Sequence, residues 1–367
     1  MESIGMFQDA SEAECWKVTG AAPVTTRWVM VGKTLDDGEK IVRCRLVGRD
    51  FKGRDQGVHE DLFAATPPLE ALKLLLRLAA VRKKGQDVIK LMFLDVRKAH
   101  LIPPCHDDVY VRLPEEFGKD KVVKLKRWLY GMRRAANSWE AYYAAKLREI
   151  GFQAGVASPV LFHNGKTGVR LVVHGDDFVF AGTHSELVEV RRWMKGWCDI
   201  KDHGILGPDD KDVKEREILG RTVRWCRDSL EYYADGKHRE IIMQEFGLSR
   251  DSKSVGSPMV KEAEGGEDEE ELEMQEASRV RGLIARANYL AQDRMDLQFT
   301  TKELSRWMSR PRKGEVVKLK RLARYLVGAE KVIWRFPFTE EECRSIDVYA
   351  DSNWAACLES RRSTSGG

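Results

Sequence analysis

The stretch Val172–Gly182, VVHGDDFVFAG, decides how this sequence is interpreted, because it places two adjacent carboxylates between two apolar segments. The apolar segments are typical of β-strands, and Asp176 and Asp177 fall at the turn between them. Neighbouring like charges repel, and charged groups beside an apolar core are costly unless something compensates them. The pair therefore lies either in a solvated hairpin turn or in a site that holds a cation.

The composition excludes several classes of protein. A hydrophobic fraction of 43% with 33% charged residues is typical of a soluble globular chain, and 367 residues suffice for two or three domains. The seven cysteines are scattered and form no C-x-x-C pair, which argues against a disulfide framework or zinc site and for a reducing compartment. The sequence lacks a run of about 18 apolar residues and an apolar signal core, so we expect an intracellular protein without a membrane span.

The net charge is only +4, but the charges are segregated along the chain. Residues 261–276 carry nine acidic residues and one Lys, whereas residues 302–324 carry nine Lys or Arg and two acidic residues. Such segregation suits a basic surface that faces phosphates, although a solvated helix face is the commoner explanation for a single basic cluster.

The order of predicted elements indicates an α+β protein. A β-hairpin over residues 28–51 is followed by a helix at Leu69–Lys83, two short strands, and a helix that stops at Gly151. A strand pair, a third strand and an amphipathic helix follow. Helices interleaved with antiparallel strands favour a sheet backed by helices on one face.

Asp95 ends another apolar strand, and only folding could bring it to Asp176 and Asp177. If these strands are neighbours, three carboxylates converge on one edge of the sheet. Oxygen ligands without His or Cys suit Mg²⁺ or Mn²⁺, and two such ions can activate a hydroxyl and stabilise a leaving oxygen in phosphoryl transfer. Taken alone, an Asp-Asp pair is more often a polar turn or a helix cap.

Several blocks of the sequence resemble, in order, the reverse transcriptase of copia-type LTR retrotransposons. They include FLDVRKAHL (93–101), VVKLKRWLYGMRRAANSWEAYY (122–143), LVVHGDDFVFAG (171–182) and DVYADSNWAACLESRRSTSGG (347–367). The resemblance covers roughly residues 25–367. It implies a right-hand polymerase of fingers, palm and thumb, in which an antiparallel palm sheet backed by helices is followed by a helical connection and a truncated RNase H-like strand.

The resemblance also implies an organisation along the chain. We expect a poorly ordered leader at 1–24, fingers and palm at 25–255, and an acidic linker at 256–278. A helical thumb or connection region would occupy 279–335, and 344–367 would be the truncated start of an RNase H-like domain.

The resemblance assigns roles to single residues. Asp95, Asp176 and Asp177 would be the catalytic carboxylates and hold two Mg²⁺ or Mn²⁺ ions.

Four further residues, Arg43, Arg45, His100 and Gly131, would contact the incoming nucleotide. Asp351 would be the first metal ligand of the RNase H remnant, although RNase H activity is not expected from this polypeptide alone.

Two departures from the family bear on activity. His174 and Gly175 replace the usual Tyr-Val before the aspartates, and the glycine is expected to loosen the turn. His100 replaces the Phe or Tyr that normally excludes a 2′-hydroxyl.

The sequence therefore predicts an RNA-directed DNA polymerase. Its partners would be a primed RNA or DNA template, dNTPs and other Pol segments such as integrase and a complete RNase H. It would act in the cytoplasm, within a virus-like particle, or in the nucleus. The alternative is a degenerate, catalytically inactive remnant that keeps the fold and binds nucleic acid.

Overall fold

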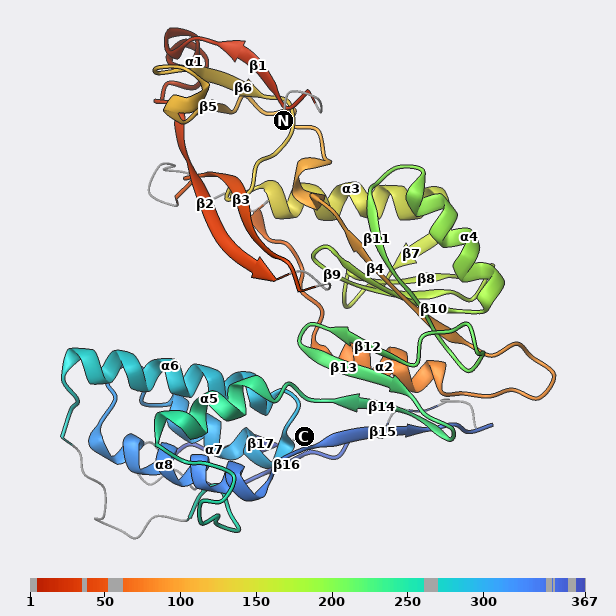
Figure 1. Ribbon diagram of the computed structural model, residues 1–367, viewed down its shortest axis with the longest axis vertical. Coiled ribbons are helices and arrows are strands. Elements are labelled where there is room, and N and C mark those ends of the chain that lie inside the picture. Colours follow the sequence, from red (N-terminus) through yellow and green to blue (C-terminus); the bar gives the residue numbers. More distant parts are fainter. Residues whose placement is uncertain are drawn as a thin grey trace.

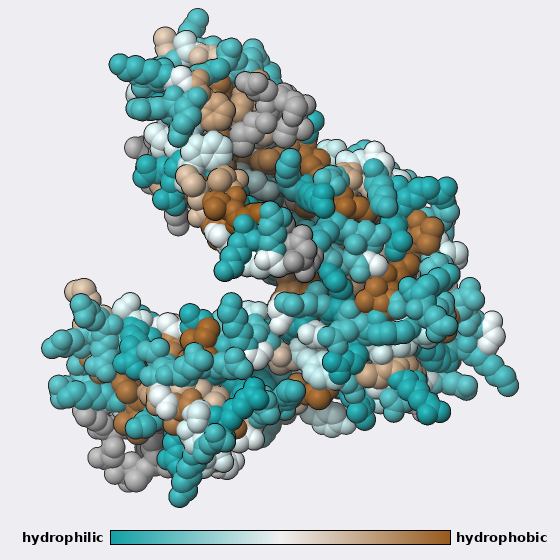
Figure 2. All heavy atoms as spheres, in the orientation of Figure 1, coloured by the Kyte–Doolittle hydropathy of each residue, from teal (hydrophilic) through white to brown (hydrophobic). Residues whose placement is uncertain are grey.

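The computed structural model describes residues 5–34, 38–51, 62–260, 270–340, 345, 347–355 and 361–366. Figure 1 shows an N-terminal sheet at the top, a central sheet flanked by helices on the right, and a helical bundle at the lower left. The space-filling view in Figure 2 is hollowed between the upper part and the lower left part. No helix within these ranges is long and apolar enough to cross a membrane.

A six-stranded antiparallel sheet forms the centre of the molecule. Its strands lie in the order β11, β4, β10, β9, β8 and β7. They are β4 (Lys90–Val96), β7 (Phe152–Ala154), β8 (Leu161–Asn164), β9 (Arg170–His174), β10 (Asp177–Gly182) and β11 (Ile200–Leu206). Strands β4 and β10 are apolar and buried at most positions, which is typical of strands that are covered on both faces.

Helices α3 (Ala135–Glu149) and α4 (His184–Lys195) cover one face of the central sheet. Trp139 of α3 and Met194 of α4 share a buried cluster with Phe178 of β10. Along α4 the buried residues recur at the spacing of one helix face, so an amphipathic sequence was enough to form this layer.

The opposite face is covered as well, contrary to the expectation of helices on one face only. Helix α2 (Leu69–Ala79) packs on it together with a second antiparallel sheet, in which the strands lie in the order β12, β13, β14, β15. The strands are β12 (Glu215–Ile218), β13 (Arg221–Trp225), β14 (Ser229–Tyr233) and β15 (Ile333–Pro337). Helix α2 ends four residues before the predicted Lys83, because the N–H of Arg82 instead donates to the carbonyl of Thr339 at 2.7 Å.

The N-terminal sheet has the strand order β1, β6, β5, β2, β3, in which only β2 and β5 are parallel. It contains β1 (Phe7–Ala10), β2 (Val24–Thr34), β3 (Lys40–Gly48), β5 (Tyr110–Arg112) and β6 (Val122–Leu125), with α1 (Glu12–Thr19) beside it and the short 3₁₀ helices η4 (Ala99–Leu101) and η5 (Glu115–Phe117). The poorly ordered leader expected at 1–24 is therefore wrong for residues 5–24. Strand β1 pairs with β6, and Met6 and Cys15 are buried, so apolar burial orders this segment.

The helical bundle follows the second sheet and returns to it. It consists of α5 (Lys237–Glu245), α6 (Met274–Ala291), α7 (Met295–Ser305) and α8 (Lys313–Gly328) around a common apolar core. The chain leaves the second sheet after β14 and re-enters it at β15, so the bundle is an insertion between two adjacent strands.

Two parts of the predicted organisation are only partly covered by the structure. Residues 261–269 of the expected acidic linker lie outside the described ranges, and α6 begins inside the range ascribed to that linker. Near the C-terminus, β16 (Asp351–Ser352) pairs with β17 (Ser365–Gly366). The α+β class, with an antiparallel sheet backed by helices and followed by a helical region, is confirmed.

Candidate active site

Asp176 lies in the turn of the hairpin between β9 and β10, and Asp177 is the first residue of β10. His174 pairs with Asp177 across the hairpin, so Gly175 and Asp176 are the two turn residues. Gly175 has a φ of 65°, whereas Asp176 does not have a positive φ. A positive φ at the first turn position alone is the pattern of a type II′ turn, which favours glycine there. Gly175 therefore suits this turn, and the expectation that it loosens the hairpin stays a prediction.

Two hydrogen bonds attach this turn to its neighbours. The indole Nε1–H of Trp139 donates to the carbonyl of Gly175 at 2.8 Å, and the N–H of Val96 donates to the carbonyl of Asp176 at 2.9 Å. The first bond connects the turn to α3 and the second connects it to the end of β4. Because Trp139 is buried, the turn is held by the core and not by its own sequence alone.

The register of the central sheet brings Asp95 to the same place. Strands β4 and β10 are neighbours, as the metal hypothesis requires, and Asp95 lies directly opposite Asp177. Residues directly opposite in an antiparallel pair point to the same face of the sheet. Asp95 and Asp177 are half-buried and Asp176 is exposed. No hydrogen bond or ion pair joins their carboxylates to another residue in the described ranges.

The electrostatics of the three carboxylates reflect burial and mutual repulsion. Burial, together with the charges of Asp176 and Asp95, raises the pKa of Asp177 to about 6. Burial and the charge of Asp176 also raise the pKa of Asp95, against the opposing charges of Lys201, Arg43 and Lys33. The three charges are thus close enough to interact, and the charges of Lys201, Arg43 and Lys33 offset only part of the rise at Asp95.

The donor chemistry of this group fits a hard divalent cation, because it offers carboxylate oxygens whose negative charge nearby cations offset only in part. As placed, however, no three His, Cys, Asp or Glu side chains in the described ranges form a group that could hold a metal ion together. The fit therefore rests on the type and charge of the donors.

The residues expected at the nucleotide differ in how they relate to these carboxylates. Arg43 is exposed on β3, and its positive charge acts on Asp95. The Arg45 guanidinium lies over the ring of Tyr130, 5.5 Å from its centre, and the ring centre of His100 lies 5.4 Å from that of Tyr130. Burial lowers the pKa of His100, and the charge of Asp176 opposes this shift. The Tyr130 ring thus lies beside both Arg45 and His100, two of the residues expected to bind the nucleotide.

Sequence reasoning missed Tyr130. Burial raises the pKa of its hydroxyl, which also experiences the charges of Arg45, Arg43, Asp176 and Asp95. The sequence did hold a signal for Tyr130, because it directly precedes Gly131, an expected site residue. The turn that positions the glycine also positions the aromatic side chain before it.

Gly131 makes a close approach possible, but its neighbour in this structure is the N-terminal sheet. Its φ is 78°, and a Cβ atom there would lie 2.4 Å from both the carbonyl oxygen of Gly48 and Cγ1 of Val47. The N–H of Gly48 donates to the carbonyl of Tyr130 at 2.8 Å. Only glycine allows β3 to pack this closely on the turn that carries Tyr130.

Asp351 lies apart from this group. It is exposed in the two-residue strand β16, and its side chain accepts a hydrogen bond from the N–H of Ser352 at 2.8 Å. No contact joins it to Asp95, Asp176 or Asp177 within the residues that the structure describes.

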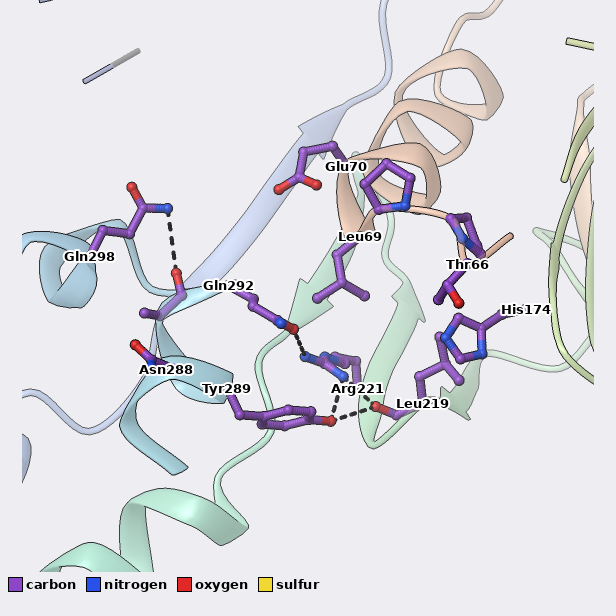
Figure 3. A pocket seen from close by; sticks show the side chains of 13 residues that line it. Thr66, Leu69, Glu70, His174, Leu219, Arg221, Asn288, Tyr289, Gln292 and Gln298 are labelled. Atoms are coloured by element: carbon purple, nitrogen blue, oxygen red, sulfur yellow. Dashed lines mark hydrogen bonds between the residues drawn. The ribbon is translucent and has the colours of Figure 1, made fainter. Parts of the chain in front are cut away.

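A cavity of about 720 Å³ lies beside the carboxylates and not on them. It opens between the start of α2, His174, the β12–β13 turn and helices α6 and α7 (Figure 3). In Figure 3, Arg221 points toward Tyr289 and Gln292 at one side of this cavity. His174 connects the two places, because it lines the cavity and pairs with Asp177.

These features define the class of the protein. A central antiparallel sheet with carboxylates on two neighbouring strands, placed between an N-terminal sheet and a helical bundle, is the palm, fingers and thumb arrangement of a right-hand polymerase.

Comparison with known families agrees with this class. Residues 16–208, just over half of the chain, match the family described as reverse transcriptase (RNA-dependent DNA polymerase). The chain belongs to this family. The resemblance to the copia-type reverse transcriptases is thereby confirmed.

The relatives are parts of longer polyproteins. The chain is 26% identical over 357 residues to the retrovirus-related Pol polyprotein from transposon RE1 of Arabidopsis thaliana, covering 94% of this chain and 23% of that protein. It is 23% identical over 368 residues to the corresponding polyprotein from transposon TNT 1-94 of Nicotiana tabacum, covering 95% and 26%. The chain thus spans about a quarter of the length of these relatives.

Among solved structures, the foamy viral protease-reverse transcriptase in complex with double-stranded DNA is similar, with a TM-score of 0.43 and 12% identity over 89% of this chain and 46% of that one.

Proposed function

We propose that this chain is an RNA-directed DNA polymerase that adds deoxynucleotides to a primer 3′-hydroxyl, as one part of a longer Pol polyprotein. The observation that carries the proposal is the pairing of Asp95 with Asp177 across two neighbouring strands, with Asp176 on the adjoining turn. Burial and repulsion from neighbouring carboxylates raise the pKa of both Asp95 and Asp177, and such a costly arrangement is expected where negative charge serves a function.

Asp95 and Asp176 would be the principal ligands of two Mg²⁺ or Mn²⁺ ions, with Asp177 as the third carboxylate. When bound, such ions lower the pKa of an attacking hydroxyl and stabilise a leaving oxygen. Bound cations would lower the raised pKa of Asp177 and Asp95, because repulsion between the carboxylates is one cause of the rise, beside burial.

The remaining residues would bind and orient the nucleotide. Arg43 supplies positive charge beside Asp95, and a guanidinium suits a triphosphate because its fork of N–H donors matches phosphate oxygens. The rings of His100 and Tyr130 are tilted to each other with their centres 5.4 Å apart, and the charge of Asp176 acts on both residues. The two rings would form the floor under the sugar. Imidazole is smaller than the phenyl or phenol ring usual in the family, so discrimination against ribonucleotides would be weaker.

The template–primer duplex would lie against the basic segments 119–134 and 302–324. Part of this charge is already used within the chain, since Lys313 pairs with Glu270 at 2.6 Å and Arg134 pairs with Asp107 at 2.6 Å. Other basic residues of these segments also form ion pairs, among them Lys124 and Lys302. Basic side chains of the two segments would contact phosphates, so the affinity for duplex should fall as salt concentration rises. Asp351 would contribute to an RNase H site in a longer polyprotein.

Primer extension on poly(rA)/oligo(dT) tests the proposal. The wild-type chain should incorporate dTTP in the presence of Mg²⁺ or Mn²⁺, and Asp176→Asn should abolish incorporation. Asp87→Asn is a matched control, because Asp87 is exposed and makes no described side-chain contact. Absence of metal-dependent incorporation, together with intact duplex binding, would identify the chain as an inactive nucleic-acid-binding remnant.

A further inference from the structure

We infer that Asp293 is a positioning residue that fixes the helical bundle α5–α8 at one orientation to the second sheet and to helix α2. Asp293 lies in the short segment between α6 and α7 and is 2% exposed. The hydroxyl of Tyr232 donates to its Oδ1 at 2.9 Å, and Nε of Arg221 donates to its Oδ2 at 2.8 Å. Lys73 Nζ lies 3.3 Å from Oδ1. One carboxylate thus receives groups from β14, β13 and α2.

The backbone of the same segment adds contacts to two elements. Nε1 of Trp334 on β15 donates to the carbonyl of Asp293 at 3.0 Å, and Lys73 Nζ donates to the carbonyl of Gln292 at 3.2 Å. The ammonium of Lys73 also lies 4.2 Å from the centre of the Trp334 ring. Two consecutive residues of the bundle are therefore held by one helix and three strands outside it.

The chain topology explains why such an attachment matters. The bundle is inserted between β14 and β15, so only two short connections, residues 234–236 and 329–332, join it covalently to the second sheet. Two connections that leave adjacent strands form a hinge, about which an inserted unit could turn. Asp293 supplies a third attachment, from the interior of the bundle.

The cavity beside Asp293 interrupts the packing that could otherwise fix the orientation of the bundle. Its 720 Å³ separate the start of α2 and His174 from α6 and α7 (Figure 3). Contacts through Arg221 close one side of this space, where the guanidinium donates to Tyr289 and Gln292 as well as to Asp293. Where packing is interrupted, directional bonds to a buried charge select one geometry better than apolar surfaces that can slide.

The charges at this attachment depend on one another. Arg221 is 3% exposed, and burial alone disfavours a charged guanidinium. Burial is the largest single influence and lowers the pKa of Arg221, but the hydrogen bond with Asp293 and the charge of Asp293, with smaller contributions from Tyr232 and Tyr289, together raise it above its ordinary value. Removing the Asp293 charge would leave Arg221 and Lys73 beside each other without their shared partner, which strongly disfavours the closed contact.

The consequence for nucleic acid rests on the proposed polymerase function. The bundle would contact the duplex whose primer end lies at Asp95 and Asp176. The orientation of the bundle therefore determines how well one duplex can contact the bundle and these carboxylates at the same time. Loss of the attachment should weaken duplex binding more than nucleotide addition on a saturating duplex.

The orientation itself can be measured without any catalysis. Spin labels at Lys195→Cys on α4 and Val317→Cys on α8, both exposed, would report the distance between the central sheet and the bundle once the reactive native cysteines are replaced by serine. Asp293→Asn should broaden the distance distribution. The matched control is Asp212→Asn, which removes a buried carboxylate 2.6 Å from Lys90 without touching the bundle.

The outcomes separate the inference from its alternatives. A distribution that broadens in Asp293→Asn and stays narrow in Asp212→Asn supports the inference. An unchanged distribution in Asp293→Asn, or equal broadening in both variants, overturns it. If Asp293→Asn does not fold, Lys73→Met removes one donor at a less buried position, and it must still broaden the distribution.

A second readout connects orientation to nucleic acid. Asp293→Asn should raise the dissociation constant for primed duplex roughly tenfold, which corresponds to ~1.4 kcal/mol, while the maximal rate of single-nucleotide addition changes less than about twofold. A loss confined to that maximal rate would overturn the positioning role. If the wild type shows no incorporation, the proposed function fails while the distance measurement still decides the inference.

Discussion

Replacing Asp177 with Asn should stabilise the metal-free protein at neutral pH, although it alters an expected catalytic carboxylate. Asp177 is half-buried and experiences the charges of Asp176 and Asp95, and together these raise its pKa from 3.8 to about 6. The folded protein therefore holds this proton more tightly than the unfolded chain does. The resulting stability is fully present below pH 3.8 and is lost as pH rises through about 6.

The magnitude follows from the size of the pKa change. A rise from 3.8 to about 6 corresponds to ~3 kcal/mol for a fully shielded carboxyl. Water reaches Asp177 and screens its interactions, so we expect Asp177→Asn to raise the free energy of unfolding by ~1–2 kcal/mol at about pH 7.5. The gain should fall to about half near pH 5 and to about a fifth near pH 4, because the carboxyl becomes protonated first in the folded state and then in the unfolded chain.

Urea denaturation in the presence of a chelator measures this directly. Asp177→Asn and Asp87→Asn would be compared with the wild type at each pH, since Asp87 provides the same chemical change at an exposed position. The reasoning is refuted if Asp177→Asn destabilises the protein at neutral pH, or if its gain does not depend on pH. A gain of equal size in Asp87→Asn would show that the three carboxylates are not its source.

Three further predictions test other parts of the structure. Mg²⁺ at about 100 times its dissociation constant should stabilise the wild type by ~2.7 kcal/mol in thermal unfolding, and the shift should largely disappear in Asp176→Asn; equal shifts in both would exclude a site at Asp176. Gly131→Ala should cost ~3 kcal/mol in urea denaturation, because its Cβ would meet Gly48 and Val47 at a positive φ; an unchanged midpoint would contradict the close approach of β3. Met6→Ala should cost ~2–4 kcal/mol if the buried Met6 anchors β1, whereas a neutral effect would return this segment to the role of a leader.

The local features of the site could be read from the sequence. The two apolar segments around His174 and Asp176 predicted a hairpin, and the turn follows from a glycine at the first turn position. The likeness of ordered blocks to a known family identified Asp95 as the partner carboxylate. The hairpin was confirmed because strand propensity and turn chemistry depend on residues that are close in the chain, whereas the catalytic role of Asp95 stays a prediction.

Other features required the folded structure. The N-terminal segment was expected to be a poorly ordered leader, yet Met6 and Cys15 are buried against strands β5 and β6, about 100 residues away in the chain. Tyr130 lies between His100 and Arg45 only because β3 packs on the turn at Gly131.

By itself, the sequence determined that this chain has an antiparallel sheet, a carboxylate-bearing turn and the motifs of a reverse transcriptase. Only the tertiary structure decided that Asp95 faces Asp177, because strand register is set by the packing of both faces of the sheet. It also decided that Asp293, an unremarked polar residue in the sequence, joins the bundle to Arg221, Tyr232 and Lys73. A buried charge is stable only beside groups that replace its lost hydration. Such groups are brought together by contacts between distant segments of the chain.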